Sequence, residues 1–118
     1  MKRYIYATED YDPELAFSGD PKVRAQVAQT TASPELLEIY ACDPKAMVQE
    51  AAAKNPNMSI KGLGDILSSA CEYDRKYEVL RAVAQELASR NPTIDELSIL
   101  SSKQFSTLLE PLAQTTTG

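Results

Sequence analysis

Apolar side chains recur along this chain at spacings of three and four residues, with polar side chains between them. Such spacing places the apolar residues on one face of an α-helix, which turns once in about 3.6 residues. The longest stretch of this kind runs from Glu72 to Arg90, and its apolar face consists of Tyr73, Tyr77, Leu80, Ala84 and Leu87. Residues 3–7 are instead β-prone, but one strand without a partner predicts an extended N-terminal arm rather than a sheet. The pattern predicts an all-α fold.

Prolines mark where many of these helices begin and end. Four of them follow Asp or Ser, whose side chains accept a hydrogen bond at a helix N-terminus, and proline fits the first helical position because its missing N–H would be unpaired there. These starts are Asp12-Pro13, Asp20-Pro21, Ser33-Pro34 and Asp43-Pro44. Two prolines follow Asn55 and Asn91, where they predict helix stops, since a residue before proline disfavours the helical conformation.

Two capping boxes add helix starts nearer the C-terminus. In Thr93 to Glu96 and in Ser101 to Gln104, a hydroxyl residue precedes Glu or Gln by three positions, so that each side chain can accept the other's backbone N–H. The expected helices span residues 13–18, 21–30, 34–41, 44–54, 59–71, 73–90, 94–100 and 102–113. We expect residues 1–114 to form a single domain and residues 115–118 to be a frayed tail.

An internal repeat organises the middle of the chain. The segment from Asp20 to Asp43 begins again at once as a second copy, from Asp43 to Leu67, and a weaker echo spans Ala88 to Leu97. The matched positions are Val23 with Val48, Val27 with Ala52, and Ala28 with Ala53. A helix this short cannot bury its own apolar stripe, so the repeat predicts helix pairs that stack as in an α-solenoid.

The first copy reads DPKVRAQVA, followed by a polar turn and SPELL. This phrase resembles the leucine-rich repeat variant, a short helical repeat comparable to HEAT repeats, over residues 20–67 and more loosely over 73–100. The resemblance implies repeats of about two dozen residues, each a helix paired with a shorter helix, stacked into a curved solenoid. Some members bind an iron–sulfur centre, but Cys42 and Cys71 alone do not supply four thiolates, so no cofactor is expected.

The stacked arrangement predicts which repeat residues are buried. Those expected in the core are Val23, Val27, Leu36, Leu37, Ile39, Val48, Ala52, Leu63, Ile66 and Leu67. Those expected in solvent are Lys22, Gln26, Glu38, Lys45 and Lys61. The N-terminal arm with the first helix, and the final helix from Lys103 to Ala113, are expected to cap the two ends of the stack.

Charge and hydropathy narrow the class of partner. The 118 residues include 12 Lys and Arg against 17 Asp and Glu, a formal charge of −5, with no basic cluster of the kind that neutralises phosphates. No apolar run reaches the length of a membrane span, and the N-terminus lacks the apolar core of a signal peptide. We therefore expect a cytoplasmic protein that binds neither nucleic acid nor membrane, and whose acidic surface favours a basic partner.

Candidate chemistry is sparse. The sequence holds no histidine, which excludes Ser-His or Cys-His catalysis and His-bound zinc. The acidic segment Glu9 to Glu14 lacks the glycine and closing glutamate of a calcium loop, so helix capping is favoured there. Gly62 and Gly64 indicate close helix approach or a helix break, and Cys42 and Cys71 indicate buried free thiols. We expect neither an enzyme nor any catalytic, cofactor-binding or metal-ligating residue.

A binding module remains the leading class of function. We expect a non-catalytic protein–protein interaction module whose partner-binding residues are polar positions on successive repeat helices, with Arg24, Gln49 and Lys54 as candidates. The alternative is a small acidic inhibitor or nucleic-acid mimic of the type carried by phages and mobile elements. Against it, acids and bases are interspersed from Lys45 to Lys103. A purely structural or oligomer-forming repeat fragment is a third possibility, and the sequence leaves partner identity and oligomeric state open.

Overall fold

The computed structural model describes residues 12–70, 76–104, 106 and 107, and the regular structure within them is entirely helical. The helices are α2 (Pro13–Ala16), α3 (Pro21–Thr30), α4 (Pro34–Tyr40), α5 (Ala46–Lys54), α6 (Ile60–Ser69), α7 (Lys76–Arg90) and α8 (Ile94–Leu97), followed by a short helical segment at residues 102–104. The predicted all-α fold is confirmed for this part of the chain. The predicted arm at residues 3–7, Tyr73, most of the final helix and the tail lie outside the described residues.

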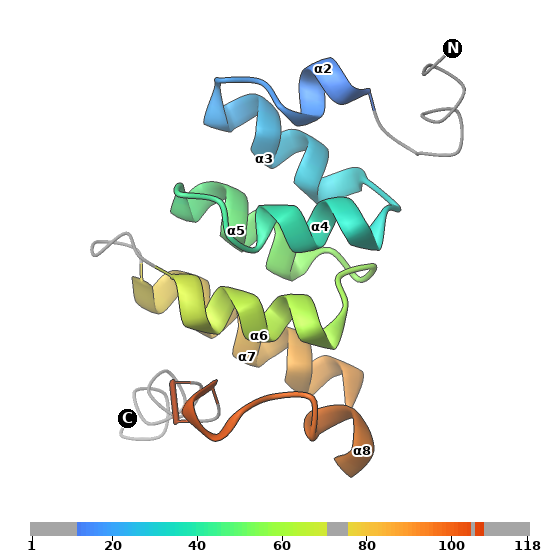
Figure 1. Cartoon of the computed structure of the whole chain (residues 1–118), viewed down its shortest axis with the longest axis vertical. Coiled ribbons are helices and arrows are strands. Elements are labelled where there is room, and N and C mark those ends of the chain that lie inside the picture. The colour runs from blue at the N-terminus through green and yellow to red at the C-terminus, as the bar shows by residue number, and fades with distance from the viewer. Residues whose placement is uncertain (1–11, 71–75, 105, 108–118) are drawn as a thin grey trace.

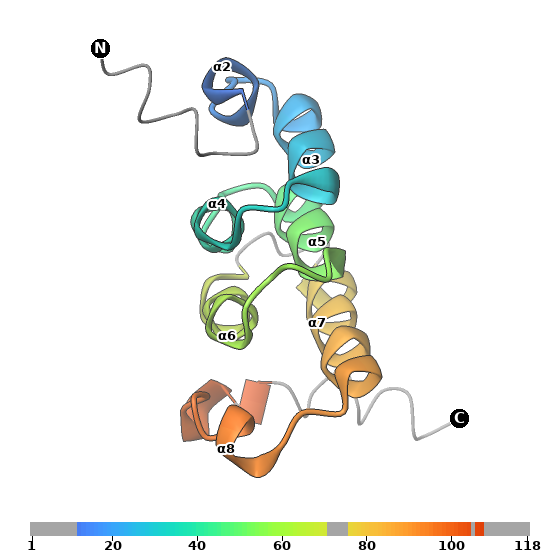
Figure 2. The same cartoon turned by 90° about the vertical axis from the view of Figure 1, so that its right-hand side faces the viewer.

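Successive helices alternate between two layers, as Figure 2 shows. The helices α2, α4, α6 and α8 form one layer, which we call the even layer, and α3, α5 and α7 form the other, the odd layer. Within the odd layer α5 packs against α3 on one side and α7 on the other, and within the even layer α4 contacts α6. In Figure 1 the even layer lies nearer the viewer, so its outer surface is the one that faces the reader.

Helix starts follow the predicted caps closely. Asp12, Asp20 and Ser33 each accept a backbone N–H at the start of α2, α3 and α4, with proline in the first turn. Ser59 caps α6 by accepting the N–H of Gly62 at 2.9 Å. Both capping boxes are confirmed, because each pairs two reciprocal hydrogen bonds of 2.8 to 3.1 Å. Local sequence therefore determines where most of these short helices begin.

The fourth predicted start, Asp43-Pro44, is wrong by two residues. The Oδ1 atom of Asp43 accepts the N–H of Lys45 at 2.9 Å, just as Asp20 accepts the N–H of Lys22 at 2.9 Å. However, α5 begins at Ala46, and Lys45 occupies the N-cap without a side-chain hydrogen bond. The carboxylate of Asp43 is also bound by Arg24 of α3, which keeps Asp43 in the turn between α4 and α5.

Both predicted stops are confirmed. The helix α5 ends at Lys54 and Asn55 is extended, with φ −79° and ψ 123°. The helix α7 ends at Arg90, and Asn91 has φ 48°, a left-handed conformation that asparagine tolerates better than most residues. Other ends shift slightly: α2 ends at Ala16, α6 at Ser69 and α8 at Leu97, each shorter than predicted.

The core lies between the two layers and confirms most of the predicted burial. Of the expected core residues, seven are buried: Leu36, Leu37, Val48, Ala52, Leu63, Ile66 and Leu67. Val23 and Val27 are partly buried. Ile39 is wrong, since it is 53% exposed: α4 buries Leu36, Leu37 and Tyr40, and in a helix that turns about 100° per residue, residue 39 lies about 100° from the middle of that buried face. Among the expected solvent residues, Glu38 is wrong because its side chain is partly buried.

Glu38 and Gly62 form the close contact between α4 and α6. The hydroxyl of Ser59 donates to Glu38 Oε2 at 2.7 Å, and a Cβ atom added at Gly62 would clash with Met58 and lie 3.4 Å from Cγ of Glu38. A Cβ at Gly64 would lie 2.6 Å from Leu100, which packs against the other side of α6. The alternative of a helix break at these glycines is wrong, because α6 runs through both, and Gly64 lets Leu100 and Gln104 approach α6 closely.

Side chains from one helix pair also bind the turns of its neighbour. Asn55, which follows α5, donates through Nδ2 to the carbonyl oxygens of Ala28 and Thr31 at the end of α3, at 2.9 and 2.8 Å. Arg90, the last residue of α7, donates to the carbonyl oxygens of Asn55, Pro56 and Met58. Carbonyl groups at a helix C-terminus have no partner within their helix, so these bonds stabilise the turns.

We predict that Leu37→Ala lowers the free energy of unfolding by about 2–5 kcal/mol, because it truncates a fully buried side chain between the layers. The matched control is Gln26→Ala on the exposed side of α3, which should change it by less than about 0.5 kcal/mol. Urea titration monitored by circular dichroism measures both values. Equal losses would contradict the assigned layer packing.

Candidate functional site

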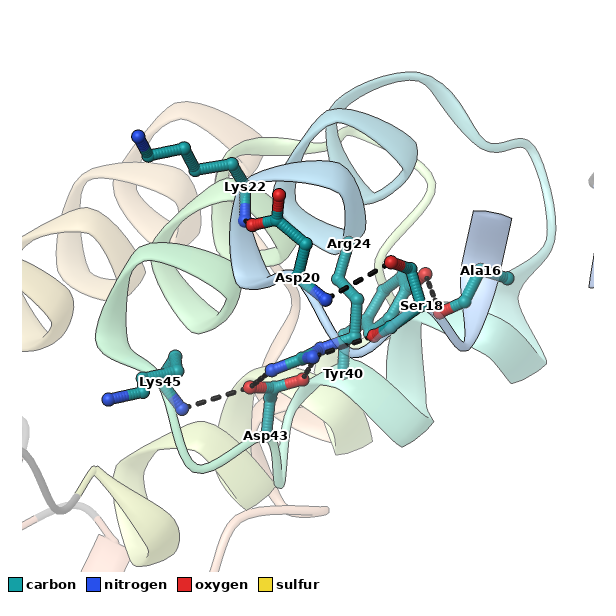
Figure 3. A network of polar contacts seen from close by, with 8 residues as sticks. All are labelled: Ala16, Ser18, Asp20, Lys22, Arg24, Tyr40, Asp43 and Lys45. Carbon is teal, nitrogen blue, oxygen red and sulfur yellow. Dashed lines mark hydrogen bonds and ion pairs between the residues drawn. The ribbon is translucent and has the colours of Figure 1, made fainter. Parts of the chain in front are cut away.

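Arg24, the first candidate, lies on α3 with its guanidinium group facing the turn between α4 and α5 (Figure 3). Its Nε and Nη2 atoms donate to Asp43 Oδ2 and Oδ1 at 2.8 and 3.1 Å, and Nη1 donates to the Ser18 carbonyl oxygen at 2.8 Å. The two charged side chains are 15% and 6% exposed. The hydrogen bond with Asp43 raises the pKa of Arg24 above its ordinary value, so the guanidinium group stays protonated. Arg24 therefore joins the turns that follow α2 and α4.

Gln49, the second candidate, is fully buried. Its Nε2 atom donates to the Ala41 carbonyl oxygen at 2.8 Å and to Ser69 Oγ at 3.1 Å, and the Ser69 hydroxyl donates to the same Ala41 carbonyl at 2.7 Å. Gln49 takes in the second repeat copy the place that Arg24 holds in the first. It joins the C-terminal ends of α4 and α6, as Arg24 joins the turns after α2 and α4.

Lys54, the third candidate, is the one of the three whose side chain lies mainly in solvent. Its side chain is 61% exposed, and Nζ lies 3.1 Å from Glu50 Oε2 one helical turn earlier on α5. The three candidates therefore do not form one surface: Arg24 and Gln49 hold helix pairs together from within, and Lys54 lies on the outer side of the odd layer.

Two shallow hollows flank α5 on the outer side of the odd layer, and both include Glu50 and Lys54. One, of about 410 Å³, lies towards α3 and is completed by Gln29, Met47 and Ala51. The other, of about 110 Å³, lies towards α7 and is completed by Glu78, Arg81, Ala82 and Gln85. Their lining carries both signs of charge, so this face offers shallow polar contacts without a preference for one sign.

Formal charge is segregated between the layers, although acids and bases are interspersed along the sequence. The three odd-layer helices contain six Lys and Arg residues against three Glu, a formal charge of +3. The four even-layer helices contain Lys61 as their one cation against six acidic residues, a formal charge of −5. The acidic residues are Glu14, Glu35, Glu38, Asp65, Asp95 and Glu96. The even layer therefore presents the acidic side of the protein.

Exposed apolar side chains also gather on the even layer. Leu15 of α2, Ile39 of α4, Ile94 of α8 and Ile99 just after α8 are all more than half exposed. Glu35 and Ile39 on α4 and Cys42 in the turn after it follow at intervals of four and three residues, and all three are exposed, so they form one outward stripe. On α6 the corresponding exposed stripe runs through Lys61, whose Nζ lies 3.0 Å from Asp65. Acidic and apolar side chains are thus adjacent on this surface.

Cys42 corrects one sequence expectation, because it is a free but exposed thiol at the end of this stripe rather than a core residue. Cys71 lies outside the described residues. Of the acidic segment Glu9 to Glu14, Asp12 and Glu14 are described, and Asp12 Oδ1 accepts the Glu14 N–H at 2.9 Å as a helix cap. Within residues 12–70, 76–104, 106 and 107, no group of three or more His, Cys, Asp or Glu side chains is placed to hold a metal ion.

No helix in the described part of the chain is both long enough and apolar enough to cross a bilayer. In comparisons with protein-family models, curated proteins and solved structures, nothing matches this chain. The surface chemistry of the molecule is therefore the basis for assigning its function.

Sequence reasoning missed the acidic and apolar face of the even layer. The signal was present in the alternation of helices: summing charge over every second predicted helix separates the two signs, whereas summing along the chain mixes them. Ile39 was also identifiable, because Leu36, Leu37 and residue 39 do not fit on one helical face together.

We predict that Asp43→Asn lowers the free energy of unfolding by about 1–3 kcal/mol, the range for losing a hydrogen bond to a charged group, because Arg24 is left without a carboxylate in a shielded position. Thermal unfolding followed by circular dichroism measures the change. Asp65→Asn removes the carboxylate of the solvent-exposed Lys61 pair and should have a much smaller effect. A larger effect from Asp65→Asn would contradict the structural role of Asp43.

We predict that Gln49→Glu lowers the free energy of unfolding at neutral pH by about 2–5 kcal/mol, because it replaces a buried donor with an acceptor facing the Ala41 carbonyl. Burial raises the pKa of the introduced carboxyl group above the pKa it has in the unfolded chain. The loss of unfolding free energy should therefore shrink as the pH falls towards the pKa of the unfolded chain's carboxyl group. Denaturant titrations at several pH values measure this. A loss independent of pH would contradict the buried hydrogen bond, as would a comparable loss in Gln26→Glu.

Proposed function

We propose that this chain is a non-catalytic protein–protein interaction module of the cytoplasm, built on short helical repeats that stack as a solenoid. The supporting observation is the even layer, where exposed apolar side chains such as Ile39 lie among acidic ones. Exposed apolar groups rimmed by charge are typical of protein-binding surfaces. A basic partner protein would be attracted by the acidic residues and retained by the apolar contacts.

The repeat reading is supported by equivalent interactions in the two copies. Arg24 and Gln49 occupy matched positions, and each reaches from an odd-layer helix to the turns or ends of two even-layer helices. The DPKVRAQVA and SPELL phrases carry the resemblance to the leucine-rich repeat variant. In this proposal each pair of helices is one repeat, and stacking the pairs creates an extended even-layer surface.

The non-catalytic part of the proposal is supported by composition. The chain has no histidine to act as a base near neutral pH, and the hollows beside α5 are shallow and carry mixed charges. A nucleophile needs a base within hydrogen-bond reach, and the exposed thiol of Cys42 has no histidine in the sequence to serve it.

A small acidic inhibitor or nucleic-acid mimic is the second candidate, and charge segregation favours it. Acids and bases alternate along the sequence, which argues against a mimic, but the even-layer helices carry six acidic residues against Lys61 alone. A protein that normally binds nucleic acid presents clustered cations, and such a surface would be attracted to this face. This candidate requires that nucleic acid and the chain compete for one site on the partner.

We predict that the immobilised chain retains a protein from extracts of its source organism, identified by mass spectrometry, and that the purified partner binds the free chain with a dissociation constant of micromolar or lower, on the order of −8 kcal/mol. Calorimetry measures the affinity. The control bait is the chain carrying Leu37→Ala and Leu80→Ala, which removes two buried core side chains.

Retention that is equal on folded and core-disrupted baits would refute the proposed module. Competition by DNA or RNA for the purified partner would favour the inhibitor over the general interaction module. Binding that is unaffected by nucleic acid would favour the interaction module over the inhibitor.

A further inference from the structure

We propose that the outer surface of α4 and α6 binds a basic amphipathic α-helix of a partner protein, with Ile39 as the central apolar contact. This inference rests on the proposed function and specifies the site and the partner's chemistry. Ile39 is 53% exposed and lies about 100° around α4 from the middle of the face that buries Leu36, Leu37 and Tyr40, so more than half of its side chain is in solvent.

Charge complementarity identifies the partner as basic. The surface around Ile39 carries Glu35 on the same stripe of α4 and Glu38 beside it, with Asp65 on the neighbouring α6. Lys61 is the one cation of α4 and α6 and is paired with Asp65 at 3.0 Å. Glu35 lies in the exposed first turn of α4, where a cation of the partner can approach it.

The secondary structure of this surface favours a helical partner segment over an added strand. Addition of a strand requires an open sheet edge with unpaired backbone groups, and the described residues form only helices. Helices α4 and α6 are neighbours in the even layer, and an α-helix can pack its ridges of side chains against the side chains of neighbouring helices. A helix with apolar residues on one side and Lys or Arg beside them would meet both Ile39 and the carboxylates.

The odd layer is the matched comparison within the same chain. Met47 is the exposed apolar residue of α5 (39%), and Glu78 lies in the exposed first turn of α7 as Glu35 does in α4. The odd-layer helices carry a formal charge of +3 rather than −5, so a basic helix lacks there the net attraction that the even layer offers. A double variant on each layer therefore replaces one exposed apolar residue with Ser and one exposed Glu with Lys, so the two variants make similar chemical changes at different positions.

The test uses the full-length chain labelled with ¹⁵N and a synthetic helical peptide of Leu and Lys arranged with all Leu on one face. Amide shifts in the spectrum should map to α4 and α6, and affinity should fall as salt rises. The double variant Glu35→Lys with Ile39→Ser should weaken peptide binding at least about tenfold, a change of about 1.4 kcal/mol. The control Met47→Ser with Glu78→Lys should leave affinity within about twofold.

Three results would overturn the inference: shifts that map to α3, α5 and α7, equal weakening by the two double variants, or equal binding of a peptide with the same composition but scattered Leu. Melting temperatures of both variants establish that they remain folded. If the partner recovered from extracts binds the Glu35→Lys, Ile39→Ser variant as tightly as the unsubstituted chain, this site is refuted while the interaction module stands. If the peptide binds α4 and α6 but extracts yield no partner, the proposed interaction module is refuted, while the inference that this surface binds a basic amphipathic helix is supported.

Discussion

The fold depends on one constraint: the backbone carbonyls at the ends of these short helices must find donors outside their own helix. Side chains from the adjoining helix pair supply them. Asn55 donates to the carbonyls that end α3, Gln49 to the Ala41 carbonyl after α4, and Arg90 to the turn between α5 and α6. A buried carbonyl left unpaired costs about 1–3 kcal/mol, so removing one pair of helices weakens the next. Packing and hydrogen bonding thus both bind each pair to its neighbours.

The local part of this architecture was predictable from sequence. Asp20, Ser33 and the Thr93 capping box act on backbone groups two or three residues away, so their effect is visible in the sequence itself. Partners distant in the chain were not predictable. Asp43 looks like another helix start, but Arg24, 19 residues earlier, holds its carboxylate in the turn and α5 begins two residues late.

The candidate site shows the same difference between interactions that are local in sequence and those with distant partners. Arg24 and Gln49 are polar residues on amphipathic helices, and sequence position alone does not distinguish a polar side chain facing solvent from one bonded across to another helix. Gln49 has its three acceptors on residues 41 and 69, so its burial is determined by tertiary contacts. Lys54 has a long flexible side chain at the end of α5 and lies in solvent as expected. Of the three candidates, the two whose partners lie on other helices or turns, Arg24 and Gln49, were therefore the ones misassigned to the surface.

Polar residues bonded across to other helices contribute to stability, whereas those that face solvent are available for binding. Arg24, Asp43 and Gln49 hold the helix pairs together and are largely shielded, so changing them alters the fold before it alters any surface. Glu35 and Ile39 face outward and contribute little to the core. Substitutions there should change stability little, so these positions can be selected for binding a partner. An exposed isoleucine gains nothing in the isolated chain, since apolar surface in water is unfavourable. Its burial against a partner would provide the stabilisation that the isolated fold does not obtain from it.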